Sequence, residues 1–206
     1  TNDADAGVLI LGKSRGTSVG SATVVQDGDQ LGRIDFQGMD GTDLETGASI
    51  LAVVDGTPGG NDMPAELIFR TTADGADGST QHLAIRANGL IEAANAVTAG
   101  TDTDTSNTGN VTLDFTANQN FVLTLTGNTT LVNPTTENVG QSGFITLIQD
   151  GTGSRTLAVG NQYFGPGGAV PTISTAANSI DVIPYIVIAA GKVLLGAAQL
   201  AFADAS

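Results

Sequence analysis

The sequence has no cysteine and no tryptophan, and basic residues are few. Without cysteine the fold cannot rely on disulfide bonds, and the redox compartment stays open. There are 7 Lys and Arg against 21 Asp and Glu, which gives a formal net charge of −14. Such a surface repels phosphate backbones and anionic lipid headgroups, so we expect no nucleic-acid partner and no electrostatic hold on a membrane. Solubility at high local concentration is the simplest role for this charge.

Long hydrophobic runs are also missing. The apolar stretch from 182 to 203 is interrupted by Pro184, Gly191 and Lys192, and its longest unbroken run covers only residues 185–190. A bilayer crossing needs about 20 apolar residues in a helix, so we expect no membrane insertion. Two buried strands joined by a turn at 189–192 explain the stretch better.

Groups suited to catalysis are scarce. The single histidine, His82, lies beside a predicted strand, and no Gly-x-Ser-x-Gly motif accompanies it, so we interpret it as a surface or subunit-contact residue. Polysaccharide cleavage uses paired carboxylates, and many acids are present. Most of them stand next to glycine, however, where Asp supports turns. We therefore predict that the protein is not an enzyme.

What the sequence does contain is glycine, 28 of 206 residues, together with short Val-, Ile- and Leu-rich runs. Turn signals such as Asp-Gly and Pro-Gly separate these runs, and residues 33–37 alternate apolar and polar side chains. These features predict an all-β protein, with helix as a minor element. Strands are expected at 22–26, 32–37, 49–54, 66–71, 82–86, 90–93, 111–115, 121–125, 129–132, 143–149, 155–159, 172–174, 179–188 and 193–195. The tail from 197 to 203 is ambiguous between strand and helix.

Three motifs in the first half are specific in combination. They are Gly-Arg-Ile-x-Phe at 32–36, Val-Asp-Gly-Thr-Pro-Gly-x-Asn-Asp-Met-Pro at 54–64 and Leu-x-Phe-x-Thr-Thr-x-Asp-Gly at 67–75. This order of pieces resembles the shaft segment of bacteriophage tail-fibre and related virion fibre proteins. The resemblance implies a β-rich, intertwined shaft or base, which we assign to residues 1–95.

A single copy of this first half would bury little apolar area and would leave strand edges unpaired. Three copies around a common axis would share one core, and the resemblance implies the same, because phage fibres are generally homotrimers. We therefore predict a homotrimer. The side chains expected in its core are Ile34, Phe36, Ile50, Leu67, Phe69, Leu83 and Ile85.

The second half begins after a polar segment, residues 96–109, that we interpret as a linker. Residues 110–206 are predicted to form a β-sandwich head of the jelly-roll kind, with a short C-terminal tail. The segments 121–131, 143–157 and 171–182 resemble a small C-terminal domain of phage fibre and other virion proteins.

One loop of this half is a candidate partner or receptor contact. Tyr163 and Phe164 precede Gly165 and Pro166, so two aromatic rings are flanked by a flexible turn. An equally good interpretation is that one ring caps the core of the head.

Calcium is the single cofactor that the sequence suggests, because carboxylates are its preferred ligands. Asp40, Asp43 and Glu45 are close enough in sequence to share an ion, and so are Asp55 and Asp62 around a Pro-Gly-Gly turn. The segment that begins Asp27-Gly-Asp29 departs from an EF-hand, because Leu31 stands at the third ligand position and Gly38 at the terminal carboxylate position. Turn structure is the favoured interpretation of the acidic groups.

Together these observations predict a non-enzymatic structural protein of a phage virion, either a trimeric fibre or a surface-decoration subunit on the tail or capsid. Its expected partners are its own copies and other virion proteins, and its head is expected to contact the host surface. The alternative is a carbohydrate-binding or polysaccharide-cleaving tailspike head, whose partner would be a bacterial surface glycan.

Overall fold

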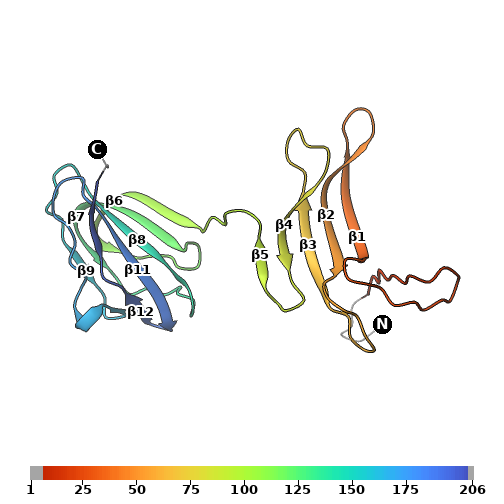
Figure 1. Ribbon diagram of the computed structural model, residues 1–206. Helices are drawn as coiled ribbons and strands as arrows, with labels where there is room; N and C mark the ends of the chain where they lie inside the picture. The colour runs from red at the N-terminus through yellow and green to blue at the C-terminus, as the bar shows by residue number, and fades with distance from the viewer. Residues whose placement is uncertain (1–6, 204–206) are drawn as a thin grey trace. The chain divides into compact units, whose positions relative to one another are not determined.

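The computed structural model describes residues 7–203, so the ends of both predicted domains lie outside the described residues. The chain divides into two compact units, residues 1–97 and 98–206. Both units are built from strands, and the single helical turn among the described residues is a 3-10 helix at Pro166–Gly168. The predicted all-β class is therefore confirmed (Figure 1).

The N-terminal unit is one antiparallel sheet in which each strand pairs with its neighbours in sequence. Turn residues fix the connections: Gly41 has a φ of 111°, and the Asp40 carboxylate accepts hydrogen bonds from the next backbone N–H groups, of Thr42 and Asp43. The strands are β1 (Gln30–Met39), β2 (Leu44–Val54), β3 (Ala65–Thr71), β4 (Thr80–Ile85) and β5 (Ile91–Ala93).

The C-terminal unit is a mixed sheet of eight strands: β11 pairs antiparallel with β8, whereas β7 pairs in parallel with both β8 and β6. The strands are β6 (Thr101–Val111), β7 (Asn120–Leu131), β8 (Ser142–Gln149), β9 (Leu157–Val159), β10 (Tyr163–Phe164), β11 (Ile180–Ala189), β12 (Lys192–Leu195) and β13 (Gln199–Phe202). Strand β7 is long enough to pair with β8 through its first half and with β9 through its second half. Hydrogen bonds thus join all eight strands into one sheet around a single core.

Alternating side chains of β7, β8, β11 and β12 supply that core, as a period of two requires. Its centre is a cluster of three rings. Phe115 packs edge-on against Phe121 and Tyr185, with ring centroids 5.1 and 5.2 Å apart. Phe115 lies in the loop between β6 and β7, so this loop closes one end of the core.

The structure corrects the interpretation of residues 96–109 as a linker, since residues 101–109 lie within strand β6. Its side chains are nearly all polar and exposed, so the strand has no apolar alternation to reveal it. Strand β6 is an edge strand that pairs in parallel with β7. Its one fully buried side chain, Asn107, donates to the carbonyl oxygens of Asp104 and Thr124.

Of the other strand predictions, some are confirmed and some are wrong. The two strands joined at 189–192 are confirmed as the antiparallel pair β11 and β12, and the ambiguous tail contains β13. The strands predicted at 22–26 and 172–174 are wrong, because both segments run without regular pairing. Residues 113–115 likewise form loop, and residues 121–131 are one continuous strand, not two.

Among residues 7–203, no helix has the length and apolar character needed to cross a membrane.

Candidate assembly interface

All seven side chains predicted for a trimer core lie on one face of the N-terminal sheet. Directly paired residues point to the same face, and one row runs from Ile34 through Ile50 and Phe69 to Leu83. Leu67 pairs with Ile85 in the next row. Phe36 lies two residues beyond Ile34 on β1 and so shares its face. We name these seven residues the apolar face.

The apolar face is open in the single chain. Phe36 is 55 % exposed and Ile34 is 43 % exposed, while Ile50, Phe69 and Leu83 are half-buried. Ile91 of β5 pairs with Ile85 and extends the face to the sheet edge, where it is also exposed. Scattered exposed apolar side chains are ordinary, but a contiguous set on one sheet face marks an interaction surface.

The opposite face of the same sheet has a different character. Its centre is a small buried cluster of Leu51, Ile68 and Ala84. Around it stand charged side chains: Arg86 forms ion pairs with Glu66 at 2.5 Å and with Glu92 at 2.7 Å. On this face ion pairs therefore surround a small buried apolar centre, whereas the residues of the apolar face form no ion pair.

Part of the apolar face is hollowed into a groove of about 250 Å³. Side chains of Ile34, Ile50 and Leu67 line it, together with Leu11 from the N-terminal segment. Leu11 lies against Gly32, where an added Cβ would come within 2.6 Å of the Leu11 Cβ. The neighbouring apolar residues Val8, Leu9 and Ile10 remain highly exposed. The chain thus covers only one corner of its own apolar face.

In the predicted contact loop, residues 163–166, one aromatic ring is buried and the other is exposed. Tyr163 is 6 % exposed and belongs to the core, and its hydroxyl group has no hydrogen-bond partner within the described chain. Burial raises the pKa of this phenol well above its ordinary value. Phe164 points the other way and is 42 % exposed, while Gly165 and Pro166 lead into the 3-10 turn.

Phe164 belongs to a second exposed apolar patch that the sequence analysis missed. On the outer side of the C-terminal sheet, Phe164 lies beside Leu194, and Leu194 pairs with Ile186. Pro184 pairs with Phe144 on the same side. The sequence signal for this patch was the unbroken apolar run 185–190. In a strand, every second residue of such a run faces outward.

The acidic residues are only partly brought together. Carboxylate oxygens of Asp40, Asp43 and Glu45 lie within 4.8 Å of one another in the exposed β1–β2 turn. Backbone N–H groups of Asp43 and Thr42 lower the pKa of Asp40, whereas the nearby charge of Asp43 raises that of Glu45. Asp55 instead accepts a hydrogen bond from Ala87 N–H, and Asp62 lies in the Gly59–Asp62 bridge. Turn hydrogen bonds thus engage the carboxylates of Asp40 and Asp55, and calcium binding stays a prediction.

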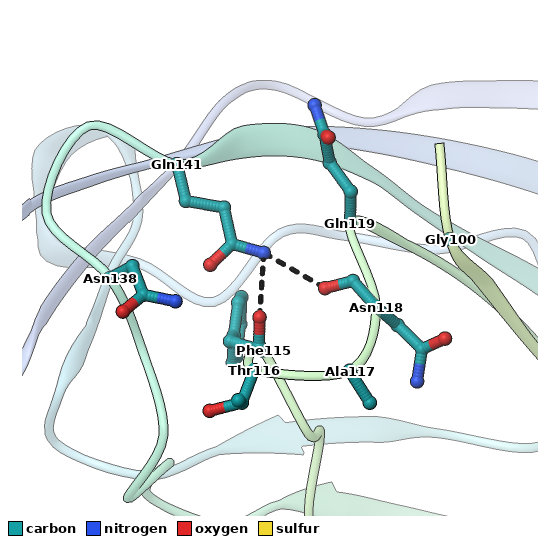
Figure 2. A pocket seen from close by; sticks show the side chains of 8 residues that line it. All are labelled: Gly100, Phe115, Thr116, Ala117, Asn118, Gln119, Asn138 and Gln141. Carbon is teal, nitrogen blue, oxygen red and sulfur yellow. Dashed lines mark hydrogen bonds between the residues drawn. The ribbon is translucent and has the colours of Figure 1, made fainter. Parts of the chain in front are cut away.

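A polar pocket of about 410 Å³ lies at one end of the C-terminal unit, between the loop 112–119 and the loop 132–141 (Figure 2). Gln141 spans it and donates from its amide nitrogen to the carbonyl oxygens of Phe115 and Asn118, at 2.9 and 2.8 Å. We name this hollow the amide pocket. The lining residues are Gly100, Phe115, Thr116, Ala117, Asn118, Gln119, Asn138 and Gln141.

The single histidine has a structural partner. His82 Nδ1 lies 3.1 Å from Asn95 Nδ2, in a contact that joins β4 to the segment after β5. His82 therefore helps to hold the edge of the N-terminal sheet.

Residues 107–192 match the family model described as "Putative phage tail fibre C-terminal domain". The chain is similar to phage tail-fibre proteins. The match runs from β6 into β12, so it covers most of the C-terminal unit and confirms the resemblance predicted from the motifs there. No curated protein matches the chain. The tail-fibre match supports a structural component of a phage virion that associates with other virion proteins.

Proposed function

We propose that the chain is the subunit of a homotrimeric fibre or surface-decoration projection, assembled through the apolar face. The observation that supports this proposal is that one exposed sheet face gathers Ile34, Phe36, Leu67 and Ile85, while the other face carries ion pairs. The similarity to tail-fibre proteins supports the setting in a virion. The trimeric number comes from the resemblance to phage fibres.

Burial of the apolar face would supply a large part of the association free energy. Fully burying a Leu, Ile or Phe side chain contributes roughly 1.5–3 kcal/mol, and seven such side chains are available in each copy. The side chains Val8, Leu9 and Ile10 stand next to the groove and add to this area. A charged group in the centre of such a contact would be desolvated without a partner.

The test is the native mass of the wild type and of Phe36→Asp. We expect a mass of three chains for the wild type and of one chain for Phe36→Asp, since each copy would bury an unpaired carboxylate. Val97→Asp is the matched control, because Val97 is equally apolar, 80 % exposed and outside the strands. It should stay trimeric. A wild-type mass of one chain would contradict the proposal.

Placement on the particle follows from copy number, measured by peptide quantitation against the major capsid protein. A few trimers per particle would favour a tail fibre that contacts the host. A number comparable with that of the capsomers would favour decoration of the capsid.

A further inference from the structure

The N-terminal sheet is preceded by an uncharged apolar segment, residues 7–12, with the sequence Gly-Val-Leu-Ile-Leu-Gly. We name this segment the arm. We propose that the arm of each copy packs on the apolar face of a neighbouring copy. The proposal rests on the proposed function, because it needs a second copy, and it adds which segment passes from one copy to the next.

Three consecutive side chains of the arm are almost free of contact within their own chain. Val8 is 80 % exposed, Leu9 is 77 % exposed and Ile10 is 82 % exposed. The arm forms no strand in the described chain, so sheet pairing does not explain its apolar character. Where apolar residues are exposed in an unbroken run, they mark an interaction site.

The next residue of the arm shows what such side chains fit. Leu11 lies against Gly32 near the start of β1 and lines the groove together with Ile34 and Leu67. Gly32 leaves the room for it, since an added Cβ there would come within 2.6 Å of the Leu11 Cβ. The apolar face thus accepts one leucine of the arm within a single chain, and the three residues before it have the same chemistry.

Ion pairs hold the base of the arm close to β1. Asp29, directly before β1, accepts from Arg15 at 2.6 Å and from Lys13 at 3.0 Å. Lys13 is two residues from Leu11, so these ion pairs and the Leu11 contact fix the arm at the same end of the sheet. Only the residues before Leu11 are then left to cover a second surface.

The most exposed side chain of the apolar face, Phe36, lies far from the arm of the same chain. Phe36 is four residues beyond Gly32 on β1, roughly 13 Å along the strand. Ile10 directly precedes Leu11, and consecutive Cα atoms are about 3.8 Å apart. Ile10 therefore cannot lie over Phe36 of its own chain while Leu11 keeps its contact with Gly32. Two apolar surfaces that stay open within one chain can cover each other between copies.

Charge and symmetry are both compatible with this exchange. Neither the arm nor the seven residues of the apolar face carry a charge, so their contact desolvates no ionised group. A ring of three copies is closed by rotation, so each copy gives one arm and receives one. Every arm in such a ring has an apolar face to cover.

Cross-linking tests the exchange, because the chain has no cysteine of its own. The test variant combines Leu9→Cys with Ala48→Cys, since Ala48 pairs with Phe36 and so lies on the apolar face. A short bis-maleimide should link this variant into species of two and three chains on a denaturing gel. Leu9→Cys alone can link two chains at most.

The matched control combines Leu9→Cys with Glu92→Cys, because Glu92 pairs with Ala84 and lies on the opposite face. It should give no species of three chains. The proposal is overturned if the test variant is a trimer by native mass but is not linked between chains, and the assembly through the apolar face then still stands. A wild-type native mass of one chain would instead overturn both proposals.

A pair of matched valines gives an independent measurement. Val8→Asp should raise the protein concentration at which half of the trimer dissociates by about tenfold or more, because a carboxylate would be buried between copies. Val8 is exposed in the single chain, so the change leaves the fold of each copy intact. Val19 is fully exposed and lies outside the arm, so Val19→Asp should behave as the wild type does. Equal midpoints for the two variants would contradict the exchange.

Discussion

Two tyrosines are buried in the C-terminal unit, but only one of them has a partner for its hydroxyl group. Tyr185 donates to the carbonyl oxygen of Gln119 at 2.7 Å, whereas the Tyr163 hydroxyl has none in the described chain. Burial raises the pKa of Tyr185 to about 12. Both phenols therefore stay protonated at neutral pH, and only the hydrogen bond separates their contributions.

This difference predicts that removing the hydroxyl group changes the free energy of unfolding differently at the two tyrosines. Tyr185→Phe should lower the free energy of unfolding by about 1 kcal/mol, because the Gln119 carbonyl loses its donor. Tyr163→Phe should leave stability unchanged or raise it by up to about 1 kcal/mol, since it removes an unsatisfied hydroxyl group. Chemical denaturation of the two variants, monitored on the C-terminal unit, makes the comparison. Equal losses in both would contradict the assignment.

At the scale of elements, Asp29 ties the N-terminal segment to the first sheet. Its carboxylate accepts from Arg15 at 2.6 Å, from Lys13 at 3.0 Å and from Gln26 N–H at 2.9 Å. The Asp29 backbone carbonyl also accepts from Val54 N–H at the end of β2. Hydrogen bonding to Arg15 is the main reason that the pKa of Asp29 lies well below its usual value.

A carboxyl group with a lowered pKa stabilises the fold only while it is ionised. Its contribution is complete above the pKa of an unfolded Asp, about 4, and is lost as the pH falls toward the lower folded value. We therefore expect Asp29→Asn to lower the melting temperature at pH 7, and the gap to the wild type to shrink below about pH 4. Asp74→Asn, an exposed position in the β3–β4 turn, is the control and should show little gap. A gap that persists unchanged in acid would refute this role.

Alternation explains which elements could be predicted from the sequence. Residues 33–37 alternate, and the seven residues chosen for a shared core do share one sheet face, because a period of two decides which side chains point together. Their burial between copies stays a prediction. Strand β6 could not be found in this way, since both of its faces are polar and its pairing with β7 is held by backbone groups and Asn107.

The amide pocket and the outer apolar patch of the C-terminal sheet could not be predicted from the sequence, for a different reason. The amide pocket collects Gly100, Asn118 and Asn138 from separate segments, and no spacing in the sequence marks their meeting. The outer apolar patch was hidden in a run whose residues were all assigned to the interior. Half of that run faces outward, and only the sheet register decides which half.

At the scale of the whole molecule, charge and apolar contact oppose each other. Each copy carries a formal net charge of −14 and also exposes its apolar face. Bringing three copies together concentrates negative charge, which repels, while burial of the face attracts. Salt weakens the repulsion and leaves the apolar contact intact. The Debye length, over which charges interact, shortens from about 30 Å at 0.01 M salt to about 3 Å at 1 M.

The proposed trimer should therefore become more stable as ionic strength rises. Analytical ultracentrifugation across a sodium chloride series should show the dissociation midpoint move to lower protein concentration. A trimer that dissociates with added salt would mean that ion pairs, and not the apolar face, hold the copies together.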